Sequence, residues 1–153
     1  MTGRELIQMA VVLIGSFCFG TLFNFRGRKL LACALGSVLS WGLYLLLGHW
    51  IASQPLVYFM VSVIISIYAE AVARILKTPA TPVVTTSLIP LIPGGSLYYT
   101  MAYAFENDFD RFLEKAVTTL QIASALALGI ILIAALSQLV FRRKGCSRKG
   151  KSL

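Results

Sequence analysis

Charged residues are scarce in this chain, and their scarcity excludes most soluble folds. Only 13% of its 153 residues are charged, whereas 58% are hydrophobic and the mean hydropathy is +0.80. A soluble domain is usually about a quarter charged and about half apolar. One core of this size cannot bury so much apolar surface, so lipid is expected to be the solvent around the chain.

The residues that mark metal sites, disulfide frameworks and many enzymes are also few. The sequence has one histidine and three cysteines, and it has no glycine-rich phosphate-binding loop. Cys18, Cys33 and Cys146 have neither the spacing of a zinc site nor that of a disulfide framework, so free thiols are expected. We therefore predict a protein that is not an enzyme, binds no metal or cofactor and does not hydrolyse ATP itself.

The chain instead contains several long apolar runs. A membrane-spanning helix needs about 20 apolar residues, and within lipid the backbone must satisfy its own hydrogen bonds. We predict a single all-α integral membrane domain over residues 1–153, with about five helices, the fourth broken between Pro90 and Gly95. The predicted helices cover residues 6–25, 30–48, 55–73, 83–105 and 117–141, and a basic tail follows at 142–153.

The fourteen basic residues are distributed unevenly among the predicted loops. Five crossings place the tail and the basic loops after the first and third helices on one side, and the acidic loop before the last helix on the other. The positive-inside rule then puts the N-terminus outside and the C-terminus in the cytoplasm. Four crossings, with the proline-rich run re-entrant, would leave a large basic cluster outside. Basic clusters between apolar runs indicate a lipid bilayer rather than nucleic acid as the partner.

The most informative stretch is an apolar run interrupted by Pro90, Pro93, Gly94 and Gly95. Proline removes a backbone donor and clashes with the preceding turn, which costs about 3 kcal/mol inside a helix. In lipid such a break is tolerated where protein or a watery cavity receives the freed backbone groups. Transporters commonly place substrate sites at broken helices near the middle of the membrane.

The break predicts a binding site for a carboxylate. A second half-helix is expected to begin near Ser96, with unpaired amides and its positive dipole end facing the break. The alternative is that the prolines only kink a packed helix. The predicted substrate-binding residues are Thr85, Thr86, Ser87, Pro90, Pro93, Gly94, Gly95, Ser96 and Tyr99.

Glu70 is an acid within an apolar run, about one turn from the end of the third predicted helix. Acids inside the membrane are rare and often functional, so Glu70 is a candidate for proton coupling or substrate binding. Arg74 lies four residues further on, and an interfacial ion pair between these two side chains is the simpler interpretation.

The proline-rich stretch resembles a known family signature. Ile89-Pro-Leu-Ile-Pro-Gly-Gly-Ser-Leu-Tyr-Tyr-Thr100, preceded by Pro79-Ala-Thr-Pro82, is similar to the small membrane subunit, or C-terminal membrane half, of the threonine/serine exporter family. Phe23-Asn-Phe-Arg26 and Ala69-Glu-Ala-Val-Ala-Arg74 are weaker marks. The order of the helices along almost the whole chain also fits this family.

The resemblance implies a subunit of a two-component secondary exporter in the bacterial inner membrane. A larger membrane subunit of the same family would be its partner. The substrates would be small metabolites with a carboxylate, either threonine and serine or a dicarboxylate such as succinate. A scaffold subunit that stabilises a partner without transporting anything is the alternative. Small residues on the second and last helices indicate close packing, some of it against another subunit or a second copy of the chain.

Overall fold

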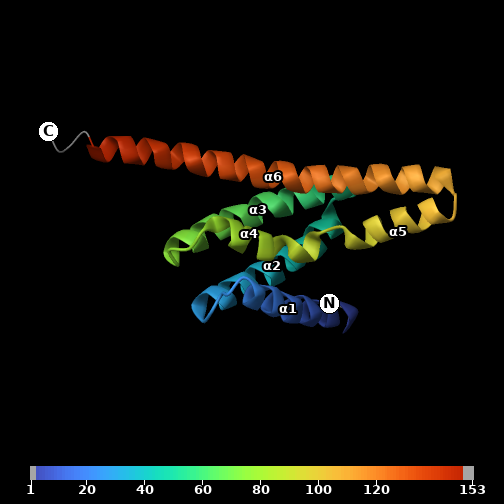
Figure 1. The fold of residues 1–153 in the computed structure, drawn as a ribbon, viewed down its shortest axis with the longest axis horizontal. Helices are drawn as coiled ribbons and strands as arrows, with labels where there is room; N and C mark the ends of the chain where they lie inside the picture. The colour runs from blue at the N-terminus through green and yellow to red at the C-terminus, as the bar shows by residue number, and fades with distance from the viewer. Residues whose placement is uncertain (1–2, 150–153) are drawn as a thin grey trace.

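The backbone is helical in the part of the chain that the structure describes, a computed structural model of residues 3–149 with side chains described for residues 7–139. No strand occurs within residues 3–149, which confirms the predicted all-α fold (Figure 1). The elements are α1 (Gly3–Leu22), α2 (Arg28–Trp50), α3 (Gln54–Ile75), α4 (Ala80–Leu88), the short 3-10 helix η1 (Ile89–Leu91), α5 (Gly94–Phe105) and α6 (Phe109–Lys149).

Three of the described helices are long and apolar enough to cross a membrane. They are α2, α3 and residues 109–139 of α6, with mean hydropathies of 2.0, 2.0 and 2.3. The apolar parts of α1 (Ile7–Leu22) and of α4 with η1 (Ala80–Leu91) are shorter. Large apolar side chains remain exposed along these helices, as expected of a surface that faces lipid rather than water. The chain is an integral membrane protein.

The helices run back and forth between two ends of the molecule. The α1–α2 loop, the α3–α4 loop and the C-terminal end of α6 lie at the left of Figure 1, and the α5–α6 turn lies at the right. The run formed by α4, η1 and α5 therefore passes from one end to the other. Its two helices continue in one general direction and do not turn back on each other as a hairpin (Figure 1).

The last helix is longer than the hydrophobic run that predicted it. The prediction placed this helix at residues 117–141, whereas α6 begins at Phe109 and its backbone continues to Lys149. Hydropathy misses the first two turns because they are rich in charge, yet Asp108 starts the helix there, since its Oδ1 accepts a hydrogen bond from the Arg111 amide at 3.3 Å. The side chains of the predicted tail at 142–153, and the backbone of 150–153, lie outside the described residues.

α3 occupies the centre of the helix packing. It packs against α2, α4 and α6, and α4 also packs against α2. α1 packs against α2, whereas α5 lies along the first part of α6 (Figure 1). The main apolar cluster joins α3, the α4–η1 segment and α6, through Val57, Val61, Ile65, Leu88, Leu91, Ile122 and Leu126. This cluster holds both α4 and α6 against α3.

Two glycines allow these helices to approach closely. An added Cβ at Gly36 of α2 would collide with the Ser87 side chain of α4, and one at Gly129 of α6 would collide with Ser62 of α3. Within lipid, helices associate through close packing and interhelical hydrogen bonds, because lipid tails are as apolar as the side chains. Both glycines belong to the small-residue pattern of the sequence, and both lie where two helices meet.

Candidate functional site

The fourth apolar run is divided into two helices. Pro90 lies in η1, and Pro93 immediately precedes α5, which begins at Gly94. Neither proline has an N–H that could continue an α-helical hydrogen-bond ladder, so the chain turns between the two helices. The break lies at residues 89–93, and α5 starts two residues before the expected Ser96.

A cavity of about 450 Å³ lies next to this break, between α4 and α6. Pro93 forms part of its wall on the side of the break. α6 faces the cavity with Ala123, Ala127 and Ala134, which follow each other at helical spacing. Because these side chains are small, they leave space between two helices that are both held against α3.

Few polar groups line this cavity. Glu70 comes from α3, and Thr81 and Thr85 come from α4, while the other lining side chains in the described part of the chain are apolar. The Thr85 hydroxyl donates to the Thr81 carbonyl oxygen at 2.9 Å. A cavity with apolar walls and a few polar groups that fix orientation is typical of a small-molecule site. Within the described residues, no three His, Cys, Asp or Glu side chains are grouped to hold a metal ion.

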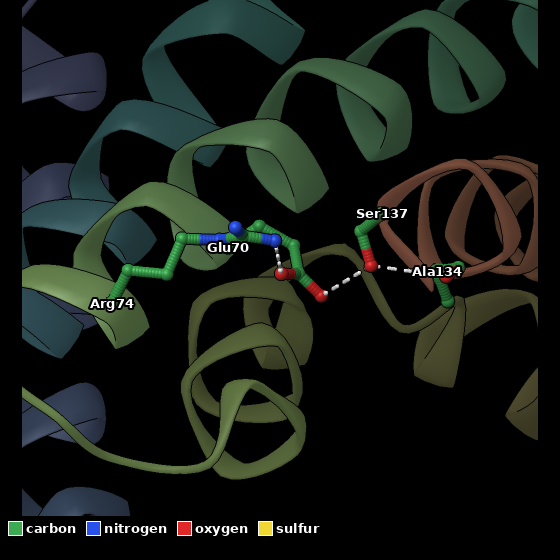
Figure 2. A network of polar contacts seen from close by, with 4 residues as sticks. All are labelled: Glu70, Arg74, Ala134 and Ser137. Carbon is green, nitrogen blue, oxygen red and sulfur yellow. Dashed lines mark hydrogen bonds and ion pairs between the residues drawn. The ribbon is translucent and has the colours of Figure 1, made fainter. Parts of the chain in front are cut away.

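Glu70 is contacted from two helices (Figure 2). On α3, Arg74 Nη2 lies 3.0 Å from Glu70 Oε2, and the two side chains form an ion pair. On α6, the Ser137 hydroxyl lies 3.1 Å from Glu70 Oε1 and 3.0 Å from the Ala134 carbonyl oxygen. The Glu70 side chain is 23% exposed and that of Arg74 is 37% exposed. The carboxylate thus connects α3 to α6 at one end of the cavity.

The predicted binding residues of α4 face two different directions. Thr85 lines the cavity, as does Pro93 further along the chain. Thr86 and Ser87 are fully buried on the side of α4 that packs against α2. There the Ser37 hydroxyl donates to the Thr86 carbonyl oxygen at 2.9 Å, and Ser87 Oγ has no hydrogen-bond partner among the described residues. The structure therefore places Thr86 and Ser87 in a helix–helix contact, not at the cavity.

The other predicted residues lie on η1 and α5. Pro90 and Ser96 are half-buried, and Tyr99 is 55% exposed. Gly94 and Gly95 are exposed, and an added Cβ at either position would meet open space. Along this part of the chain, the last residue that lines the cavity is Pro93, which immediately precedes α5. These residues thus border the break without lining the cavity.

Two polar residues near the cavity were not predicted from the sequence. Thr81 lies one turn before Thr85 and shares its helix face, so the i, i+4 spacing was a usable signal. Ser137 is a hydroxyl within an apolar run, but its contact with Glu70 depends on α3 packing against α6. The sequence pattern does not contain that tertiary contact.

The fold and the cavity together define a class of protein. A helical membrane protein with a helix broken at prolines, and with an acid in the wall of an adjoining cavity, has the features of a membrane transporter. The sequence profile of the threonine/serine exporter family, ThrE, matches residues 8–136. The chain belongs to this family, which confirms the resemblance and indicates an exporter-type transport role. None of the curated proteins and none of the solved structures that were compared matches the chain.

Proposed function

We propose that the chain is one subunit of a two-component secondary exporter of small metabolites that carry a carboxylate. Membership of the threonine/serine exporter family supports the transport role, and it favours a protein without enzymatic activity. The observation that carries the proposal is the cavity that adjoins the break at Pro93 and has Glu70 in its wall. Threonine and serine are the first substrates to test, and a dicarboxylate such as succinate is the second.

The break supplies the proposed carboxylate site. In α5 the Leu97 amide donates to the Pro93 carbonyl at 3.0 Å, and the Gly94 amide donates to the Ile92 carbonyl at 2.6 Å. The amides of Gly95 and Ser96 precede the first turn of intrahelical bonds and are available to an anion. The positive end of the α5 dipole adds to this attraction.

Glu70 is the proposed coupling group. A carboxylate in a membrane-embedded cavity can bind and release a proton, and an ion gradient would then drive export. Its ion pair with Arg74 and its contact with Ser137 hold it at the boundary between α3 and α6. A purely structural ion pair is the alternative role, and the pH dependence of transport distinguishes the two.

The proposed partner is a larger membrane subunit of the same family. α5 packs against α6, yet Tyr98 and Tyr99 remain 69% and 55% exposed. Tyrosine hydroxyls are better accommodated at a protein interface or at the membrane surface than among acyl chains. A partner that covers α5 would also complete the surroundings of the break.

Purification of the tagged chain from its native membranes in mild detergent tests this assignment. We expect a second polytopic protein to accompany the chain in a fixed ratio, as identified by mass spectrometry. Proteoliposomes of that complex are expected to exchange labelled threonine or succinate. Recovery of the chain alone, as a defined homo-oligomer, would contradict the two-component proposal.

We also propose a bacterial inner-membrane location with the N-terminus outside and the C-terminus in the cytoplasm. The basic loops and the C-terminal end of α6 lie at one end of the molecule, which the positive-inside rule assigns to the cytoplasm (Figure 1). In a variant that keeps Cys146 but has Cys18 and Cys33 replaced by alanine, an impermeant thiol reagent should label only permeabilised cells. Labelling of Cys146 on intact cells would contradict this orientation and place the C-terminus outside.

A further inference from the structure

The cavity between α4 and α6 exposes the carboxylate of Glu70, whose ion-pair partner Arg74 is not among the lining residues. Glu70 is the charged side chain among its lining residues in the described part of the chain, and apolar side chains form most of the wall. Charges interact more strongly in such surroundings than in water, because the effective dielectric constant is lower. A dicarboxylate would bring two further negative charges close to Glu70, whereas an amino acid brings an ammonium group.

The carboxylate of Glu70 has capacity for one more donor. Arg74 Nη2 approaches Oε2 at 3.0 Å and the Ser137 hydroxyl approaches Oε1 at 3.1 Å. A carboxylate offers about four lone-pair positions on its two oxygens, and these two contacts with described residues occupy only part of that capacity. An ammonium group has three N–H donors and no acceptor, and it matches such a site.

We infer that Glu70 binds the ammonium group of an amino-acid substrate, and that Ser137 positions the carboxylate for this contact. The inference rests on the proposed transport function and assigns a residue to substrate selection. Arg74 belongs to the same helix as Glu70, so its ion pair can hold the carboxylate whatever α6 does. The hydrogen bond from the Ser137 hydroxyl connects the Glu70 carboxylate to α6, which forms the opposite wall of the cavity.

The cavity is long enough for this ammonium site and the break to lie at different positions along it. Its α6 wall extends from Ala123 to Ala134, which is roughly 16 Å at 1.5 Å per residue. One amino acid is too short to touch Glu70 and the start of α5 together, so the two ends are successive positions along a path. A proton and an ammonium group compete for the same carboxylate, and this competition links proton binding at Glu70 to substrate release.

Selectivity in proteoliposomes of the purified native complex tests the role of Glu70. The probes are labelled threonine, with unlabelled threonine, N-acetylthreonine and succinate as competitors. N-acetylthreonine keeps the carboxylate and the side chain but has no ammonium group. We expect only threonine to compete well in the wild type. In Glu70→Gln the preference for threonine over N-acetylthreonine should fall about tenfold or more, because a hydrogen bond to a charged group is lost.

Variants of α6 test the positioning role of Ser137. Ser137→Ala should raise the KM for threonine several-fold with little change in kcat, and Ser137→Thr, which keeps the hydroxyl, should restore it. Ser124→Ala is the control, because the Ser124 hydroxyl donates to the Gln121 carbonyl three residues earlier at 2.9 Å, as Ser137 does to Ala134 at 3.0 Å. A simple loss of helix stability would affect both alanine variants alike.

The possible failures of the two proposals have different signatures. If the wild-type complex exchanges neither labelled threonine nor labelled succinate, the transport function itself is contradicted. If it exchanges threonine and Glu70→Gln keeps the wild-type preference over N-acetylthreonine, the ammonium site is wrong and the exporter stands. Competition by succinate that equals competition by threonine in the wild type would also overturn the ammonium site, and Arg74 would then be the group to examine.

Discussion

The two halves of the broken fourth run, α4 and α5, have very different surroundings. α4 packs against α2 and α3 and buries Val83, Thr86, Ser87 and Leu88. α5 packs against α6, and Thr100 is its buried residue. One half is therefore fixed in the centre of the helix packing, whereas the other is supported from one side. The break lets these halves differ, because the hydrogen-bond ladder does not continue from one to the other.

The less supported half is also the half that begins at the cavity. Pro93 at the start of α5 forms part of the cavity wall. The hydroxyls of Thr100 and Thr119 lie 3.4 Å apart and are a side-chain contact between α5 and α6.

The largest effect is expected on protein stability, when the contact between α4 (the fixed half) and α2 is overpacked. Gly36→Leu places a side chain where Ser87 of α4 and Tyr68 of α3 already lie. Overpacking of this kind costs about 1–3 kcal/mol, so we expect less folded protein and a lower Tm in detergent. Gly48→Leu on the same helix is the control, because nothing lies within 4 Å of its added Cβ. Equal stability of the two variants would contradict the close α2–α4 contact.

Next in size is the effect of joining the two halves. Pro90→Ala combined with Pro93→Ala restores two N–H donors, and removing a proline favours a continuous helix by up to about 3 kcal/mol. We expect efflux to fall at least tenfold while the protein remains abundant in the membrane. Pro82→Ala, in the first turn of α4 where proline is tolerated, serves as the control. Wild-type efflux in the double variant would show that the break has no part in transport.

A moderate effect is expected at Glu70, outside the two halves. Glu70→Gln keeps the shape of the side chain but cannot ionise, so the pH profile of efflux should flatten if Glu70 couples a proton. Among the residues whose side chains are described, the groups that face Glu70 are Arg74 on α3, Ser137 on α6 and, across the cavity, Thr81 and Thr85 on α4. Of these, only Arg74 carries a charge. An unchanged profile would leave Glu70 as the structural partner of Arg74.

The smallest expected effect compares two neighbouring residues of α4. Thr85 lines the cavity, whereas Thr86 is buried and its hydroxyl donates to the Pro82 carbonyl oxygen at 2.8 Å. Thr85→Val should raise the KM for the substrate about two- to tenfold, the value of one neutral hydrogen bond, without lowering the Tm. Thr86→Val should leave the KM unchanged. The reverse pattern would mean that the substrate reaches the other face of α4.

Much of the fold could be predicted from hydropathy and from the prolines. Apolar runs of spanning length predict helices because lipid leaves the backbone no other partner, and the prolines mark the break because they remove donors. The start of α6 was missed because its first turns are charged, and a hydropathy pattern reports burial in lipid rather than helix formation.

The candidate site was only partly predictable. The hydroxyls of Thr85, Thr86 and Ser87 are adjacent in the sequence, and only the packing of α4 against α2 decides that Thr85 alone faces the cavity. The Glu70–Arg74 pair follows from i, i+4 spacing, whereas the contact with Ser137 requires knowing that α3 packs against α6. Local patterns specify helices and their ends, and the relative rotation of the helices specifies the site.

The measurement that tests the central claim most directly is efflux by Gly94→Leu. An added Cβ at Gly94 meets open space within the chain, so folding should be normal, and the leucine side chain occupies the start of α5 at the break. Gly15→Leu on α1 is an equally unobstructed control away from the break. We predict an intact complex that loses threonine efflux in Gly94→Leu and keeps it in Gly15→Leu. Wild-type efflux by Gly94→Leu would contradict the account and favour a scaffold subunit.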